Sequence, residues 1–263
     1  MIDLVSLADK YEVSSFCEGD PSYFLRWYPL SKKADVETAS FIAAMLSFGS
    51  RKQFIPKIKL ILETADKTSG SITKWICEGC PRFKNLADAN SGGCRDGVSG
   101  SFNESDKFYR FYSYKDMADL FGALKNILTK EKTLGEYFRK LYENAGNDLA
   151  LIIGGAFKDA KIVPKGKNSA NKRIHMFLRW MVRRNSPVDL GLWDWYGQEK
   201  LIIPLDVHVM QVAESLGFLD KTDKPSYKTA VKLTQKMEKY FPKDPARADF
   251  ALFGSGVSDV MEN

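Results

Sequence analysis

The chain lacks the features of secreted, disulfide-stapled and membrane-spanning proteins. Its 263 residues include four cysteines, and its apolar runs fall short of the roughly 18 residues that a spanning helix needs. The first residues, MIDLVSLADKYE, are acidic and have too few apolar side chains for a signal peptide. We therefore expect a cytoplasmic protein with reduced thiols and no membrane partner.

Strand signals are also scarce, and helical periodicity dominates. The apolar side chains recur at three- and four-residue intervals, with acidic first turns and glycine stops, over most of the chain. The pattern predicts an all-α fold. Helices are expected at 35–49, 51–65, 115–128, 133–143, 147–157, 207–216, 226–240 and 245–253, and one begins near Lys172. Residues 81–106, rich in Gly, Ser, Asn and Asp, are expected to form a long loop.

The cysteines form no complete metal-ligand pattern. Cys77 and Cys80 have the spacing of a CxxC pair, but Cys94 and Cys17 stand at irregular distances from them. We expect free thiols, no metal site and no cofactor.

Negative charge is nearly missing from one segment. Lys and Arg number 39 and Asp and Glu 33, which gives a net charge of +6, yet residues 158–184 alone contain nine basic residues and only Asp159 as an acid. A local excess of +8 favours an anionic partner, and nucleic acid is the usual one. A solvated helix face is the alternative explanation.

The helix that begins near Lys172 separates apolar from basic side chains. At 100° per residue, Ile174, Phe177, Leu178 and Met181 form one stripe. Arg179 and Arg183 fall on the opposite side, within about 20° of Lys172. The spacing predicts a cationic ridge that follows phosphates.

A turn precedes this helix and can cap it. Its Gly and its polar side chains leave backbone N–H groups free at the helix start, and such groups bind phosphate oxygens without reading sequence. Asn168 or Ser169 is the expected helix cap. The expected phosphate contacts from this turn are Lys165, Gly166, Lys167, Asn168 and Ser169.

An aspartate follows a proline 34 residues after Lys172, in the string Pro204-Leu205-Asp206-Val207-His208. Asp206 is expected at a helix start, where the helix dipole favours an ionised carboxylate. A lysine and an aspartate placed in this way suit the cutting of a base from DNA. The carboxylate stabilises the positive charge that develops on the sugar, and the lysine amine attacks a sugar carbon. A helix cap for Asp206 and a phosphate contact for Lys172 are the structural alternatives.

These residues carry a resemblance to the helix-hairpin-helix DNA glycosylase superfamily, which includes 8-oxoguanine glycosylases and endonuclease III. Lys172 matches the lysine of the lyase members, and Pro204, Asp206 and His208 match their Pro-x-Asp-x-His-like string. The strings KRIHMFLRWMVRR, SPVDLGLW, LIIPLDVHV and DFALFG also resemble a bacterial family of no assigned activity that is placed in this superfamily by similarity.

The resemblance implies a two-lobed fold with a central cleft. Residues 35–204 would form the middle lobe, with the hairpin near 162–184, and residues 1–34 and 205–263 would form the second lobe. There are two departures from the superfamily. Leu46-Ser47-Phe48-Gly49-Ser50 replaces a helix end that carries DNA-inserting glutamines, and no cysteine follows Cys94, which excludes the C-terminal iron–sulfur cluster.

The activity implied is base excision from damaged duplex DNA, with or without abasic-site lyase chemistry, by a monomer. Catalysis would fall to Lys172 and Asp206, and Arg173, Arg179, Arg183 and His208 would join the turn residues in binding DNA. The base pocket would include Phe48, Asp189, Trp193 and Trp195, although Asp189 could instead cap a short helix and the tryptophans could belong to the core. Two other hypotheses stay open: a non-catalytic DNA-binding protein on the same scaffold, and an unrelated helical enzyme acting on a phosphorylated small molecule.

Overall fold

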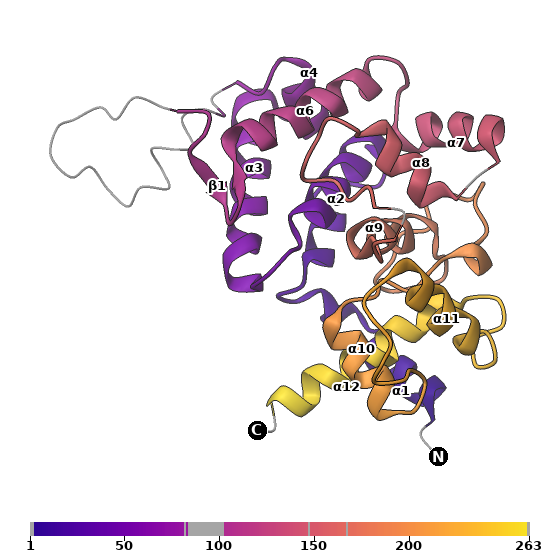
Figure 1. Cartoon of the computed structure of the whole chain (residues 1–263). Coiled ribbons are helices and arrows are strands. Elements are labelled where there is room, and N and C mark those ends of the chain that lie inside the picture. The colour runs from indigo at the N-terminus through magenta and orange to yellow at the C-terminus, as the bar shows by residue number, and fades with distance from the viewer. Residues whose placement is uncertain (1–2, 82, 84–102, 147, 167, 262–263) are drawn as a thin grey trace, which may run out of the picture.

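The regular elements are almost all helices, which confirms the all-α class (Figure 1). The computed structural model describes residues 3–81, 83, 103–146, 148–166 and 168–261. The α-helices are α1 (Leu4–Tyr11), α2 (Lys33–Leu46), α3 (Arg51–Ser69), α4 (Ile72–Cys77), α6 (Tyr114–Leu128), α7 (Leu134–Ala145), α8 (Leu149–Ala156), α9 (Lys172–Val182), α10 (Val207–Ser215), α11 (Tyr227–Met237) and α12 (Ala248–Met261). The 3₁₀ turns are η1 (Ser14–Cys17), η2 (Pro21–Arg26), η3 (Gln198–Lys200) and η4 (Pro245–Arg247).

One small sheet accompanies the helices. Strands β1 (Lys107–Tyr109) and β2 (Tyr112–Ser113) pair antiparallel, with Tyr109 opposite Tyr112. Ser113 then starts α6 through a capping box with Asp116, because each side chain bonds the other's backbone N–H. This hairpin, α1 and α4 were not expected from the sequence. Most of the loop expected at 81–106 lies outside the described residues.

The hydrophobic core divides into two clusters. The larger one runs from Phe24 to Leu201 and includes Ala246, and it is built on α2, α3, α4, α6, α7, α8 and α9. The smaller one joins Leu4 and Ala8 of α1 to side chains between Ile203 and Leu252 and to Ala170. Figure 1 shows α1, α10, α11 and α12 together on one side of α9. The chain thus passes from one cluster to the other near residue 202.

Helix α9 starts differently from the sequence expectation. Its N-cap is Asn171, not Asn168 or Ser169, and the Asn171 side chain caps no backbone N–H. Asn171 has a φ of 45°, which asparagine tolerates better than most residues. Its Nδ2 instead donates to the carbonyl of Gly166 at 2.9 Å, so it closes the preceding turn.

In the described part of the chain, the helices are all too short or too polar to cross a membrane.

Candidate active site

A cleft of about 420 Å³ opens where the two hydrophobic clusters meet. Met176 and Trp180 of the first cluster and Val209 of the second all line it. Its polar lining comes from the residue before η2, the end of α2, the start of α3, one face of α9, the residue before α10 and the start of α12. The polar and charged members are Asp20, Ser47, Arg51, Lys172, Arg173, Arg179, Asp206 and Asp249.

The structure brings Lys172 and Asp206 together in this cleft. The Lys172 Nζ lies 3.0 Å from the Asp206 Oδ2, and the two side chains are 31% and 29% exposed. Lys172 is the first residue of α9 and Asp206 precedes α10, so two helix starts meet at the pair. An ion pair with this exposure is open to a substrate and stabilises the fold by less than about 1 kcal/mol.

Asp206 is also the N-cap of α10, as its alternative interpretation required. Its Oδ1 accepts the N–H of Val209 at 2.9 Å. Burial alone would raise the pKa of Asp206, but the Lys172 ammonium and the Val209 N–H outweigh burial and bring this pKa below its usual value. Asp206 is therefore a carboxylate at neutral pH, with one oxygen held by the helix and the other by the lysine.

A second carboxylate, Asp249 of α12, lines the same cleft and was not expected there. It accepts a bond from the Arg179 Nη1. Burial raises the pKa of Asp249 to about 6, against the opposing effect of Arg179. The one sequence signal for this residue was an acid inside an otherwise apolar helix string, Ala248-Asp249-Phe250-Ala251-Leu252.

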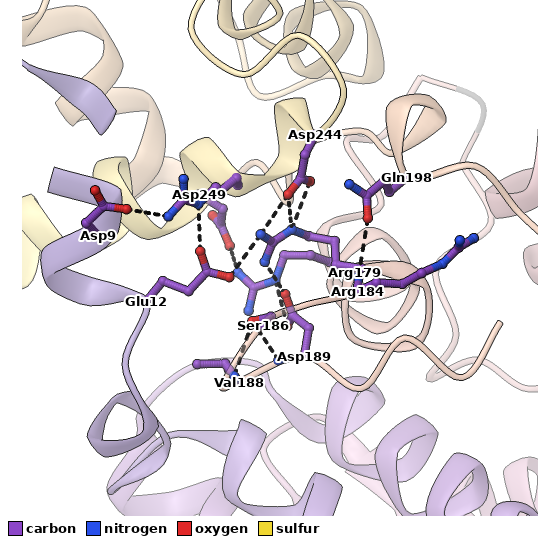
Figure 2. A network of polar contacts seen from close by, with 12 residues as sticks. Asp9, Glu12, Arg179, Arg184, Ser186, Val188, Asp189, Gln198, Asp244 and Asp249 are labelled. Atoms are coloured by element: carbon purple, nitrogen blue, oxygen red, sulfur yellow. Dashed lines mark hydrogen bonds and ion pairs between the residues drawn. The ribbon is translucent and has the colours of Figure 1, made fainter. Parts of the chain in front are cut away.

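The cationic ridge expected on α9 does not form. Arg179 and Arg183 are 3% and 2% exposed, and both pair with buried carboxylates. Figure 2 shows Arg179 within this network, beside Asp189, Asp244 and Asp249. The Arg183 Nη2 lies 2.9 Å from the Glu12 Oε1 and 2.8 Å from the Asp244 Oδ2. Carboxylates and the Phe250 ring cover both guanidinium groups. The two arginines therefore form no exposed ridge for phosphates, although Arg179 still lines the cleft.

Asp189 lies in this network and not in the cleft, which corrects its expected place in a base pocket. It pairs with the Arg179 Nε at 3.3 Å and with the Arg183 Nη1 at 2.5 Å. Asp189 is fully buried, and burial raises its pKa although both guanidinium groups oppose the rise. Its carboxylate therefore compensates two arginines.

The two tryptophans expected in the base pocket belong elsewhere. Trp193 is buried in the first cluster, and its Nε1 donates to the Glu37 Oε1 at 3.0 Å. Trp195 packs on Trp193 with ring centroids 5.5 Å apart, and neither residue lines the cleft. The core alternative is correct for Trp193, because a buried carboxylate fixes its indole N–H.

Phe48 and Arg173 do line the cleft. Phe48 is half-buried, and the Arg173 guanidinium carbon lies 5.6 Å from the centre of its ring. The Arg173 Nη1 donates to the carbonyl of Met45 at 2.5 Å, which ties α9 to the end of α2.

The other residues expected to contact DNA differ in their exposure and in their hydrogen bonds. Gly166, Asn168 and Ser169 are exposed, and the Lys165 Nζ donates to the carbonyl of Ala160 at 2.7 Å. Lys167 lies outside the described residues. His208 is half-buried beside the Phe253 ring, 5.8 Å between centroids, and its Nε2 has no hydrogen-bond partner among the described residues.

Cys17, Cys77 and Cys80 are free thiols. Across the described ranges no group of three or more His, Cys, Asp or Glu side chains is arranged to hold a metal ion. Cys94 lies outside those ranges.

The fold and the cleft define an all-α protein with a lysine–aspartate pair at the junction of two hydrophobic clusters. The chain belongs to the family described as Protein of unknown function (DUF2400), whose model matches residues 20–258. Searches of the curated proteins and of the solved structures gave no match.

Proposed function

We propose that this protein excises a damaged base from duplex DNA and that Lys172 is the attacking amine. The observation that carries the proposal is the Lys172–Asp206 pair, 3.0 Å apart and still partly open in a cleft. The pair joins the two strings on which the resemblance to helix-hairpin-helix DNA glycosylases rests. The division of the core near residue 202 is consistent with their two-lobed fold.

The cleft suits one nucleotide turned out of a duplex. Its volume of about 420 Å³ is in the range of small-ligand sites, which extends from about 300 to 1,000 Å³. Enzymes that act on a base hold it in such a pocket, by contacts to apolar and aromatic side chains. Phe48, Met176 and Trp180 supply apolar and aromatic side chains here.

Asp206 acts first in the proposed mechanism. As the bond between the sugar C1′ and the base nitrogen breaks, its electron pair leaves with the base and positive charge develops on the sugar. The Asp206 carboxylate is ionised and prearranged, so it stabilises that charge without reorganising.

Lys172 acts second. Its ammonium group must first lose a proton. The departing base accepts this proton, because the base becomes more basic as the bond to the sugar breaks. The neutral Nζ then attacks C1′. As the C1′–O4′ bond opens, one Nζ proton passes to O4′ and a protonated Schiff base remains. Loss of a C2′ proton to water and departure of the 3′-phosphate by β-elimination then cut the strand. The 3.0 Å ion pair holds Nζ beside the carboxylate where the charge develops.

The start of α9 would bind the DNA backbone. Arg173 and the exposed turn residues Gly166, Asn168 and Ser169 surround Lys172 in the chain. Lys158, Lys161, Lys165 and Arg184 retain exposed positive charge, although Arg179 and Arg183 do not. The interface is therefore less positive than the net charge of residues 158–184 suggested.

Borohydride trapping tests this proposal. Parent protein, Lys172→Gln and Asp206→Asn are incubated with duplexes that each carry one lesion or an abasic site. We expect a covalent adduct that peptide mapping places on Lys172 and that Lys172→Gln abolishes. We expect Asp206→Asn to lose base excision but to keep the fold, because asparagine also caps helices.

Lys165→Gln is the matched control, because Lys165 lies in the turn before α9 and its Nζ is held by a backbone carbonyl. An adduct on Lys165 would refute the assignment of Lys172. Excision without any adduct would leave a glycosylase without lyase activity. Binding to abasic DNA without excision would favour the non-catalytic scaffold, and the absence of any salt-dependent DNA binding would favour the small-molecule enzyme.

A further inference from the structure

The β1–β2 hairpin places an exposed aromatic side chain at the mouth of the cleft. Phe108, Tyr109, Tyr112 and Tyr114 are all nearly buried, whereas Phe111 at the hairpin tip is 58% exposed. The Phe111 ring lies 5.3 Å from the ring of Phe48, which lines the cleft. The core thus accounts for the neighbouring rings but not for Phe111.

The hairpin tip is firmly attached to the cleft. The Tyr109 hydroxyl donates to the carbonyl of Phe48, and the Tyr112 hydroxyl accepts from the Arg173 Nη2 at 3.2 Å. These bonds connect both strands to the end of α2 and the start of α9. Because both strands are held, the hairpin tip is fixed in position, and Phe111 stays at the cleft when a molecule binds there.

Arg110 adds positive charge beside this ring. Its guanidinium carbon lies 4.9 Å from the centre of Phe48 and 5.4 Å from the centre of Phe111. Arg110 has a φ of 51°, which is uncommon for arginine, and a Cβ at Gly49 would come within 2.1 Å of its Nη1. The glycine thus leaves the space in which this guanidinium lies across Phe48.

The positive charges of Arg110 at the hairpin tip and of Arg173 on α9 suit a polyanion. Within the described residues neither Arg110 nor Arg173 lies within ion-pair distance of a carboxylate, unlike the buried Arg179 and Arg183. Two arginines without acidic partners attract phosphates. Both guanidinium groups lie beside the Phe48 ring, and the exposed Phe111 ring packs against that same ring. An exposed aromatic ring suits the apolar interior of a base stack, because such side chains insert between base steps.

We propose that Phe111 enters the base stack of duplex DNA next to the nucleotide held in the cleft, while Arg110 and Arg173 contact the flanking phosphates. The inference rests on the proposed function, since the nucleotide in the cleft has left a gap in the duplex. Phe111 fills that gap and favours the extruded state. It is a positioning residue and takes no part in the bond-breaking steps.

The test uses a tetrahydrofuran abasic analogue, which has no base to excise, in a duplex with 2-aminopurine beside it. Loss of stacking raises 2-aminopurine fluorescence, so the readout does not depend on chemistry. We expect the parent protein and Phe111→Trp to raise the fluorescence and Phe111→Ala to abolish the rise. Phe111→Ala should bind about tenfold more weakly, which corresponds to about 1.4 kcal/mol and is within the range for one stacked base.

Tyr240→Ala is the control, because Tyr240 is also an exposed aromatic residue, at 40%, and its ring contacts Phe218, which packs against the second cluster. It should behave as the parent protein. Melting curves of the variants separate stacking from folding, and Phe111→Trp should restore the signal if stacking is the cause. Equal fluorescence and affinity for parent and Phe111→Ala would overturn this inference while the Lys172 adduct still supports the proposed function. No binding of the parent to any duplex would overturn both.

Discussion

Replacing Arg179 by methionine should destabilise the fold strongly. The buried network holds three guanidinium groups, from Arg179, Arg183 and Arg247, each less than a third exposed. Four largely buried carboxylates face them, those of Glu12, Asp189, Asp244 and Asp249, and the exposed Asp9 also pairs with Arg247. Among the buried groups, carboxylates therefore already outnumber guanidinium groups by one, and Arg179→Met makes that excess two.

The magnitude follows from this imbalance. Removing one partner from a buried ion pair costs about 3–5 kcal/mol, because the remaining charge stays without compensation. Asp189→Asn removes the excess instead, and should cost about 1–3 kcal/mol, the usual effect of a weakened buried hydrogen bond. For a chain of this length about 2 °C accompanies each kcal/mol, so Arg179→Met should melt about 6–10 °C lower.

Urea denaturation followed by circular dichroism measures both variants. The pH dependence gives a second check. Burial already raises the pKa values of Asp189 and Asp249, and loss of Arg179 raises them further. Groups with a raised folded pKa bind more protons when folded, so the Arg179→Met deficit should shrink as the pH is lowered from 8 toward 5. A loss below about 1 kcal/mol, or a larger loss for Asp189→Asn, would refute the charge-balance reasoning.

Two further predictions concern packed residues. Burial lowers the pKa of His175 from 6.5 to about 4, so the unfolded chain binds more protons between these values and the parent should lose up to about 3 kcal/mol as pH falls from 6.5 to 4. His175→Phe should flatten that dependence in pH-series denaturation, and parallel curves would contradict the assignment. Gly135→Ala should cost about 1–3 kcal/mol, because its Cβ would lie 2.6 Å from the Trp193 Nε1. The control Gly122→Ala, with open space in α6, should be neutral or stabilising in the same melts, and equal effects would refute the steric argument.

Local patterns were sufficient for the helices. Periodicity identified α2, α3, α6, α7, α8, α10 and α11 to within a few residues, because a helix hydrogen-bonds to itself and needs only one apolar face. The β1–β2 hairpin was missed, since its five strand residues carry too little alternation to distinguish a strand from a loop. The cap of α9 was misplaced because Asn171 adopts a left-handed conformation, which the sequence does not reveal.

The candidate site was predicted only in part. Lys172 and Asp206 each stand beside a helix start within a recognisable string, and the structure places them 3.0 Å apart. Asp249 was missed and Asp189 was assigned to the wrong site. Which acid faces the cleft depends on how α12 packs against α9, and no local string encodes that packing.

The sequence by itself determined the all-α class, the amphipathic shape of α9 and the Lys172–Asp206 pair as candidate site. Tertiary structure alone decided whether the face of α9 that carries Arg179 and Arg183 is exposed or buried. The sequence showed Arg179 and Arg183 opposite a core stripe, where solvent was the natural expectation. Their carboxylate partners, Asp244 and Asp249, lie 61 and 70 residues farther along the chain. A helical pattern reports which side chains share a face, but only packing against a distant element decides whether that face meets water or a second core.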